Sequence, residues 1–173
     1  GEWLEPAKVQ YVTSANLTDH VDAINCTTDQ IKFLAEIPDH MFREQVRDFM
    51  TNAQFTILAD SDRMGYRLKG PELKCKKPIE LISSGVTNGT IQLLPSGQCI
   101  VLLADHQTTG GYPRIGHIIQ SDIPTLVQQS PGTIIRLIPV NMETAEKINN
   151  RQGQYLQQLK NACTLQLNAY HRH

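Results

Sequence analysis

Short apolar runs, most of them broken by alternating polar residues, recur along the chain and are typical of β-strands. Most runs have the length of one strand in a globular protein, and Gly, Pro, Asn, Asp and Ser separate them. Residues 90–104 hold two strands, because Pro95, Ser96 and Gly97 form the turn of a hairpin. The runs that we interpret as strands lie at residues 31–37, 54–60, 79–86, 90–104, 112–120 and 133–140, with a weaker one at 8–13.

Apolar residues at helical spacing predict only three helices. Ser121 or Asp122 caps the second of them, which is short. Gly153 interrupts the polar C-terminal helix, whose apolar residues lie roughly on one face. The three helices cover residues 38–52, 121–132 and, from Met142 onward, the end of the chain.

The order of these elements indicates the fold class. Strands that are not each followed by a crossover helix pair mainly antiparallel, in a barrel or a sandwich. The sequence therefore predicts a mostly β, α+β-class protein with short helices and a C-terminal helix. We expect a lead-in segment at residues 1–30, one compact β domain at 31–141 and the C-terminal helix at 142–173.

Composition excludes several classes of protein. With 16 Lys and Arg against 17 Asp and Glu, the net charge is −1 and basic residues do not cluster, which disfavours nucleic acid and anionic membranes as partners. Apolar runs such as Ile100–Ala104 are far shorter than the roughly 20 residues that span a bilayer. The first ten residues have no basic start followed by an apolar stretch, so we expect no secretory signal and a cytoplasmic location.

The cysteines support the same interpretation. They are scattered and form no C-x-x-C pair, so the sequence predicts free thiols and no metal site. The four are Cys26, Cys75, Cys99 and Cys163.

The stretch LLADHQTTGGYPRIG, residues 102–116, ends a buried run in many hydrogen-bonding side chains and a pair of glycines. A simple turn does not need Asp, Gln and two Thr in a row, whereas a site for an amide, a ureido ring or a carboxylate does. Asp105 and His106 could act as acid or base. Because neighbours on a strand point to opposite faces, at most one of them enters a given pocket.

Two earlier stretches carry further candidates. In SDRMGYRL, residues 61–68, the guanidinium groups of Arg63 and Arg67 suit a carboxylate, although solvated turn charges are the alternative. In residues 83–98, Ser and Gly offer backbone N–H groups to an anion or simply lead into the hairpin. Gln92 faces either solvent or a polar cavity. No hydrolase elbow, P-loop, zinc-protease or dinucleotide motif is present.

Taken in order, SDRMGYRL, SSGVTNGTIQLLPSGQCIVLLADHQTTGGYP and IIRLIPV resemble the biotin-dependent carboxyltransferase family. Its members are also called allophanate hydrolase subunit 2, Kip antagonist or the C-subunit of 5-oxoprolinase. The resemblance implies a cyclophilin-like β-barrel, and it implies Arg63 and Asp105 as candidates for catalysis. The pocket residues carried over are Arg63, Gly65, Tyr66, Gln92, Asp105, Gln107, Thr108, Thr109, Gly110, Gly111 and Tyr112.

The resemblance also implies an activity and partners. It points to a part of an ATP-dependent 5-oxoprolinase-type hydrolase complex, with a subunit-1 protein of the Kip inhibitor type and a protein of the lactam-utilisation type. One alternative is carboxyl transfer from biotin, on a separate carrier, to urea or a related amide. Another is a regulatory binding module of the Kip antagonist type. ATP would act at the level of the complex.

The chain departs from the family pattern in length and at three positions. It resembles only the C-terminal half of the family, so we expect the missing N-terminal half to be a partner and the isolated chain to be inactive. Ser84 stands where the family has Glu, and Leu94 and Cys99 stand where prolines are common. A lost carboxylate at position 84 would change a contact in the pocket.

Overall fold

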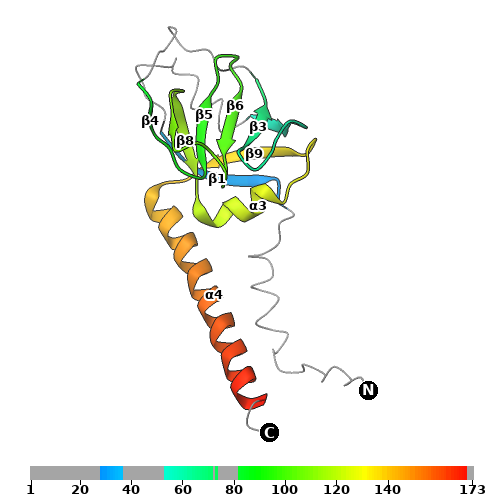
Figure 1. The fold of residues 1–173 in the computed structure, drawn as a ribbon, viewed down its shortest axis with the longest axis vertical. Helices are drawn as coiled ribbons and strands as arrows, with labels where there is room; N and C mark the ends of the chain where they lie inside the picture. Colours follow the sequence, from blue (N-terminus) through cyan, green and yellow to red (C-terminus); the bar gives the residue numbers. More distant parts are fainter. Residues whose placement is uncertain (1–27, 37–52, 72, 74–81, 171–173) are drawn as a thin grey trace. The chain divides into compact units, whose positions relative to one another are not determined.

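The computed structural model describes residues 28–36, 53–71, 73 and 82–170, with side chains up to residue 164. Within these ranges, seven strands form a closed barrel (Figure 1). They are β1 (Gln30–Ala35), β2 (Gln54–Ile57), β3 (Gly65–Lys69), β5 (Thr90–Leu93), β6 (Cys99–Leu102), β8 (Arg114–Ile118) and β9 (Ile134–Pro139). A separate two-stranded ribbon joins β4 (Ser84–Gly85) to β7 (Thr109–Gly110).

Around the barrel the strands follow the order β1-β8-β5-β6-β3-β2-β9, and β9 returns to β1. All neighbouring pairs are antiparallel except β1 and β9, which run parallel, with Ile31 opposite Leu137. The prediction of a mostly β barrel is confirmed. The parallel closing pair is a detail that the pattern of apolar residues does not contain.

The central hairpin of β5 and β6 forms where the turn residues predict it. Gly97 N donates to Leu94 O at 2.9 Å, and Leu94 N donates to Gln98 O at 2.8 Å. Gly97 has a φ of 82°, which a residue without Cβ adopts at little cost. This turn sets the register in which Gln92 lies opposite Ile100.

Alternate residues of each strand point into the barrel and form the core. Phe33 and Phe55 are 1% exposed, and Ile31, Leu68, Ile91, Val101, Ile115 and Leu137 are fully buried. Cys99 lies in the same core as a free thiol, and burial raises its pKa to about 12. The thiol is therefore uncharged and unreactive in the folded chain.

The helix predicted at residues 121–132 is real but is not capped as expected. It consists of a 3-10 turn, η1 (Gln120–Asp122), and α3 (Ile123–Val127), which lies at one end of the barrel (Figure 1). Neither helix start has a side-chain cap. The Asp122 carboxylate instead accepts hydrogen bonds from Lys32 N at 2.8 Å and Lys32 Nζ at 3.4 Å, which tie α3 to β1.

The C-terminal helix, α4 (Met142–Tyr170), is confirmed, and it continues through Gly153 without a break. Internal contacts divide the chain near this glycine: Cys26–Gly153 form one compact unit, and Gln154–His173 belong to the other. In the first unit Ala145 is buried, and Asn149 Oδ1 accepts a hydrogen bond from Ser121 N at 3.0 Å. The start of α4 thus belongs to the same compact unit as the barrel.

Several predicted elements lie outside the described residues. They are the strand at 8–13, the helix at 38–52 and the first three residues, 79–81, of the strand at 79–86, together with Cys26 and Cys75; the described part of that last run holds only the short strand β4. Among the described residues, no helix is long and apolar enough to cross a membrane, and no cluster of three His, Cys, Asp or Glu could hold a metal ion.

Candidate ligand-binding cleft

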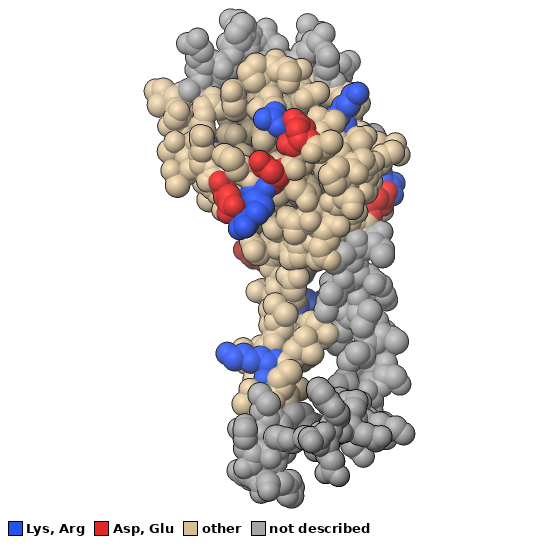
Figure 2. Space-filling view, turned by 45° about the vertical axis from the view of Figure 1, so that its right-hand side comes forward, with Lys and Arg blue, Asp and Glu red and all other residues tan. Residues whose placement is uncertain are grey.

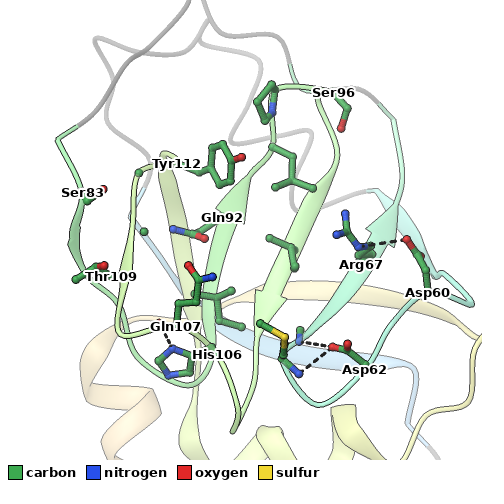
Figure 3. Close-up of a pocket in the computed structure, with 18 residues that line it drawn as sticks. Asp60, Asp62, Arg67, Ser83, Gln92, Ser96, His106, Gln107, Thr109 and Tyr112 are labelled. Atoms are coloured by element: carbon green, nitrogen blue, oxygen red, sulfur yellow. Dashed lines mark hydrogen bonds and ion pairs between the residues drawn. The ribbon is translucent and has the colours of Figure 1, made fainter.

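A cleft of about 780 Å³ lies on the outer face of β5, β6 and β3 (Figure 3). The strand register brings Gln92, Ile100 and Arg67 into one row across these three strands, and all three line the cleft. Their strand neighbours point inward, so the same strands build the core on one face and the cleft on the other. We call Gln92, Ile100 and Arg67 the outer row.

Gln92 stands out within this row because its amide is buried without a partner. The residue is 4% exposed, and Nε2 has no hydrogen-bond acceptor in the part of the chain that the structure describes. Gly110, from the β7 side of the cleft, makes room for it: a Cβ at position 110 would overlap with Gln92 Nε2. A buried donor without an acceptor costs free energy, and the carbonyl oxygen of a ligand in the cleft would supply the acceptor.

Arg67 forms the opposite side of the cleft together with two aspartates. Its Nε lies 3.2 Å from Asp60 Oδ2, and both side chains remain partly exposed. Asp62 Oδ1 accepts hydrogen bonds from Met64 N at 2.8 Å and Gly65 N at 3.2 Å, which fixes the corner that leads into β3. Figure 3 shows Arg67 with Asp60 on one side of the cleft and Gln92 with Thr109 on the other.

The loop from residue 106 to residue 112 covers the Gln92 side. His106 Nδ1 contacts the carbonyl oxygen of Gln107. Because a carbonyl only accepts, this contact is a hydrogen bond when Nδ1 carries a proton; in that tautomer of a neutral imidazole, Nε2 is an acceptor. Backbone hydrogen bonds hold this loop at both ends: Val86 N donates to Thr108 O at 3.0 Å, and Leu93 N donates to Pro113 O at 2.9 Å. Between them, β7 pairs with β4.

Most of the predicted pocket residues line this cleft. They are Gly65, Gln92, Gln107, Thr109, Gly110, Gly111 and Tyr112. Their roles stay predictions, but the structure does bring the corner before β3 and the stretch after β6 to one cavity. Gln92, for which the sequence left solvent or a polar cavity open, faces the cavity.

Arg63, Tyr66, Asp105 and Thr108 do not line it. Arg63 Nε pairs with Asp105 Oδ2 at 3.1 Å, but the Arg63 side chain is 82% exposed. Tyr66 packs against the core, and its hydroxyl donates to Val127 O at 3.0 Å. Strand alternation explains the place of Tyr66, which points away from Gly65 and Arg67 on β3. Asp105 and His106 lie after the end of β6, outside any strand, and of these two only the histidine lines the cleft.

Several lining residues were not among the predicted pocket residues. The sequence could have predicted Arg67 as a lining residue, because it lies two positions after Gly65 on the same strand and therefore on the same face of the sheet. Asp60 and Asp62 precede the strand, where sequence alone gives no direction to a side chain. Arg67 and His106 were considered from the sequence as a carboxylate partner and as an acid or base, but they were not among the pocket residues carried over. The lining residues outside that set are Asp60, Asp62, Met64, Arg67, Ser83, Leu94, Pro95, Ser96, Ile100, Leu102 and His106.

Comparison with known proteins assigns the family. The family described as carboxyltransferase domain, subdomains A and B, matches residues 3–139. The chain belongs to this family. The membership that the motifs predict is therefore confirmed.

Two curated relatives of this carboxyltransferase-family chain are both named as the C-subunit of 5-oxoprolinase. The protein of Haemophilus influenzae is 36% identical over 132 residues, which is 76% of this chain and 43% of the relative. The protein of Escherichia coli is 40% identical over 120 residues, 69% of this chain and 39% of the relative. The chain thus spans about two fifths of the length of either relative.

A solved structure supports the fold of this family member. The urea carboxylase of Kluyveromyces lactis matches with a TM-score of 0.68 at 19% identity, over 74% of this chain and 12% of that chain. At this identity the match shows the fold alone. The predicted barrel is confirmed by both the topology and this similarity.

The charges of the cleft do not fit a nucleotide triphosphate. Among its described lining residues, Arg67 is the only Lys or Arg, it is already paired with Asp60, and Asp62 adds a second carboxylate. Figure 2 shows one face of the molecule, where basic and acidic side chains of the described residues lie beside one another rather than as a broad basic patch. The cleft does fit a neutral ring amide or a ureido ring, since both offer a carbonyl oxygen to Gln92.

Proposed function

We propose that this chain supplies the C-terminal part of a 5-oxoprolinase-type subunit and that its cleft binds the cyclic amide of the substrate. The observation that carries the proposal is the Gln92 amide, which is 4% exposed and has no acceptor among the described residues. The proposal is also supported by the identity of 36–40% to proteins named as the C-subunit of 5-oxoprolinase.

The chemistry of ring opening suits this arrangement. Water adds to the lactam carbonyl carbon, the C–N bond breaks, and 5-oxoproline becomes glutamate. Negative charge develops on the carbonyl oxygen before the bond breaks, and a donor held in a dry site stabilises it. In this proposal Gln92 Nε2 is that donor, and His106 Nε2 is an acceptor for a proton in the same cleft.

Other parts of the complex must supply what this chain lacks. Hydrolysis of ATP would provide the free energy for ring opening, and the charges of the cleft favour a nucleotide site elsewhere in the complex. We propose as partners the N-terminal part of the same subunit, a subunit-1 protein of the Kip inhibitor type and a protein of the lactam-utilisation type. Since the chain spans only about two fifths of its relatives, it is expected to be inactive alone.

Carboxyl transfer is the second candidate, and the description of the family as a carboxyltransferase domain favours it. Here the ureido carbonyl of biotin, on a separate carrier, would take the place of the lactam carbonyl beside Gln92. Inhibition of the reconstituted activity by avidin would support this second function. Glutamate formation from 5-oxoproline and ATP that avidin does not affect supports the first.

The test is Gln92→Leu in the subunit assembled with its partners, assayed for ATP-dependent release of glutamate. We expect activity to fall about a hundredfold, because one oxyanion donor is lost. Stability should stay the same or rise, since an unpaired buried amide is replaced by an apolar group of similar size. Gln54→Leu, at an exposed position of β2, is the matched control and should leave activity unchanged.

A merely structural Gln92 would give the opposite pattern, with lost stability and retained activity in the folded fraction. If the chain binds subunit 1 tightly but 5-oxoproline is not converted with any combination of the partner proteins, the proposal is contradicted. The regulatory binding module of the Kip antagonist type would then be the remaining hypothesis.

A further inference from the structure

The geometry points to Asp60 as a stand-in for a ligand carboxylate: in the free cleft Asp60 holds Arg67, and a bound monocarboxylic ring amide replaces it there. The lactam carbonyl then faces Gln92 and the carboxylate faces Arg67. This inference rests on the proposed function and adds the orientation of the ligand and the roles of Asp60 and Arg67.

The outer row provides the spacing for this orientation. Gln92 lies opposite Ile100, and Ile100 lies opposite Arg67, so the two polar residues are separated by one strand. Strands in a sheet lie about 4.8 Å apart, which puts the two backbones about 10 Å apart. A five-membered ring with a polar group at each end fits between side chains that start at that separation.

The floor of the cleft suits the ring itself. Ile100 and Leu102 present half-buried aliphatic side chains to the cleft, from the strand between the two polar ends. Gly65 keeps the floor flat, because a Cβ there would lie 2.9 Å from Ile100 Cδ1. The cleft therefore offers apolar surface in the middle and hydrogen-bonding groups at both ends.

Arg67 can accept a second carboxylate. Its contact with Asp60 uses Nε, and the structure gives no partner for the two terminal nitrogens among the described residues. Guanidinium groups bind carboxylates through pairs of N–H donors. Asp60 is 64% exposed, so its carboxylate can turn to solvent at small cost.

Charge explains why Asp60 would have to leave. With Asp60 and Asp62 both charged, the cleft carries two carboxylates and one guanidinium, and a ligand carboxylate would add a third negative group. Asp62 cannot move away, because it accepts two backbone N–H groups. Within the described ranges, the ion pair to Arg67 is the one side-chain contact given for Asp60, and the ligand replaces it with a similar one.

The experiment measures binding of 5-oxoproline and of 2-pyrrolidinone, which lacks the carboxylate, to the full 173-residue chain by NMR titration. Arg67→Met should weaken binding of 5-oxoproline about tenfold or more and leave 2-pyrrolidinone unchanged. Asp60→Asn should strengthen binding of 5-oxoproline about threefold, because a competitor and a repulsive charge are removed. Opposite effects from two residues in contact are the signature of this inference.

The matched control is Asp29→Asn. Asp29 forms an ion pair with Arg136 at 3.0 Å, with side chains about as exposed as those of the cleft pair, but neither residue lines the cleft. Its substitution should change neither affinity. If Arg67→Met does not fold, Arg67→Lys and Asp60→Asn still test the inference. Both variants keep a cation in the cleft, so both must bind 5-oxoproline more tightly than 2-pyrrolidinone.

Weaker binding of 5-oxoproline to Asp60→Asn, equal changes for both ligands, or no binding of either ligand would overturn the inference. The proposed function fails in a different way. If the affinities change as expected but the assembled complex releases no glutamate, the orientation stands and the reaction is wrong.

Discussion

Two neighbouring rows of residues cross β5, β6 and β3, and they have opposite characters. The outer row of Gln92, Ile100 and Arg67 lines the cleft. One residue further along, Leu93, Cys99 and Leu68 form an inner row that is 3%, 2% and 0% exposed. The inner row belongs to the hydrophobic core and the outer row lines the cleft, so substitutions in the two rows should have separable effects.

The largest expected effect is on stability, from the inner row. Leu68→Ala should lower the free energy of unfolding by about 2–5 kcal/mol, because a fully buried side chain is truncated. Ile100→Ala, half-buried in the outer row, should cost about 1 kcal/mol. Urea denaturation followed by circular dichroism measures both. Equal losses would mean that the two rows are not distinct.

The next largest effect should be on ligand binding, with little change in stability. It compares two glycines of the β4–β7 ribbon, Gly110 as the test position and Gly85 as the control. Gly110→Ala should displace the Gln92 amide and weaken binding of 5-oxoproline about tenfold. The fold should persist, because the clash is with the end of a flexible side chain. Gly85→Ala on β4, where a Cβ meets nothing within 4 Å, is the control and should bind like the original chain. Lost affinity in both variants would place the effect in the ribbon and not in the cleft.

A smaller effect on stability comes from His117, on β8 at the edge of the core. Burial lowers its pKa below 6.5, and the charge of Glu36 opposes this only in part. The unfolded chain therefore takes up a proton before the folded chain does, so stability falls as the pH drops from about 6.5 through the lower pKa of the folded state. His117→Gln should flatten the pH dependence of the melting temperature between about pH 7 and about pH 5. An unchanged slope would assign that dependence to other groups.

The smallest effect should come from the exposed pair of Arg63 and Asp105. The family resemblance implies both residues as candidates for catalysis, so on that basis alone Ala at either position would lower activity. Their place outside the cleft lining, at the surface, now predicts less than about a threefold change in binding of 5-oxoproline, well below that of Arg67→Met. NMR titration of Arg63→Ala and Asp105→Ala checks this. A loss as large as that of Arg67→Met would extend the site to this pair.

The parts of the fold that depend on local pattern were predictable. Alternation of apolar residues indicated the strands, and Pro95 to Gly97 indicated the hairpin. The parallel pair of β1 and β9 was not, because its residues lie more than a hundred positions apart in the sequence and nothing local specifies the pairing. Asp122 illustrates the same limit: it is a good helix cap by local rules, but Lys32 on a distant strand uses its carboxylate.

The site was predictable to the extent that its residues share a motif. The glycines, Gln107, Thr109 and Tyr112 follow one another along the chain and do meet in the cleft. Which of two adjacent residues enters a pocket depends on the phase of a strand, and this phase separates Arg67 from Tyr66. The burial of Gln92 depends on Gly110 approaching from another strand, which only the folded chain reveals.

The pairing of β1 with β9 also determines when, during synthesis of the chain, the barrel can close. The first described strand stays without its second neighbour until residue 139 has been made, so the barrel cannot close on the ribosome before nearly the whole domain has emerged. Until then the edges of β1 and β2 that β9 will cover are exposed and can pair with other chains. A nascent chain that stops before residue 134 therefore lacks the strand that joins β1 to β2 and cannot form a smaller version of the same barrel.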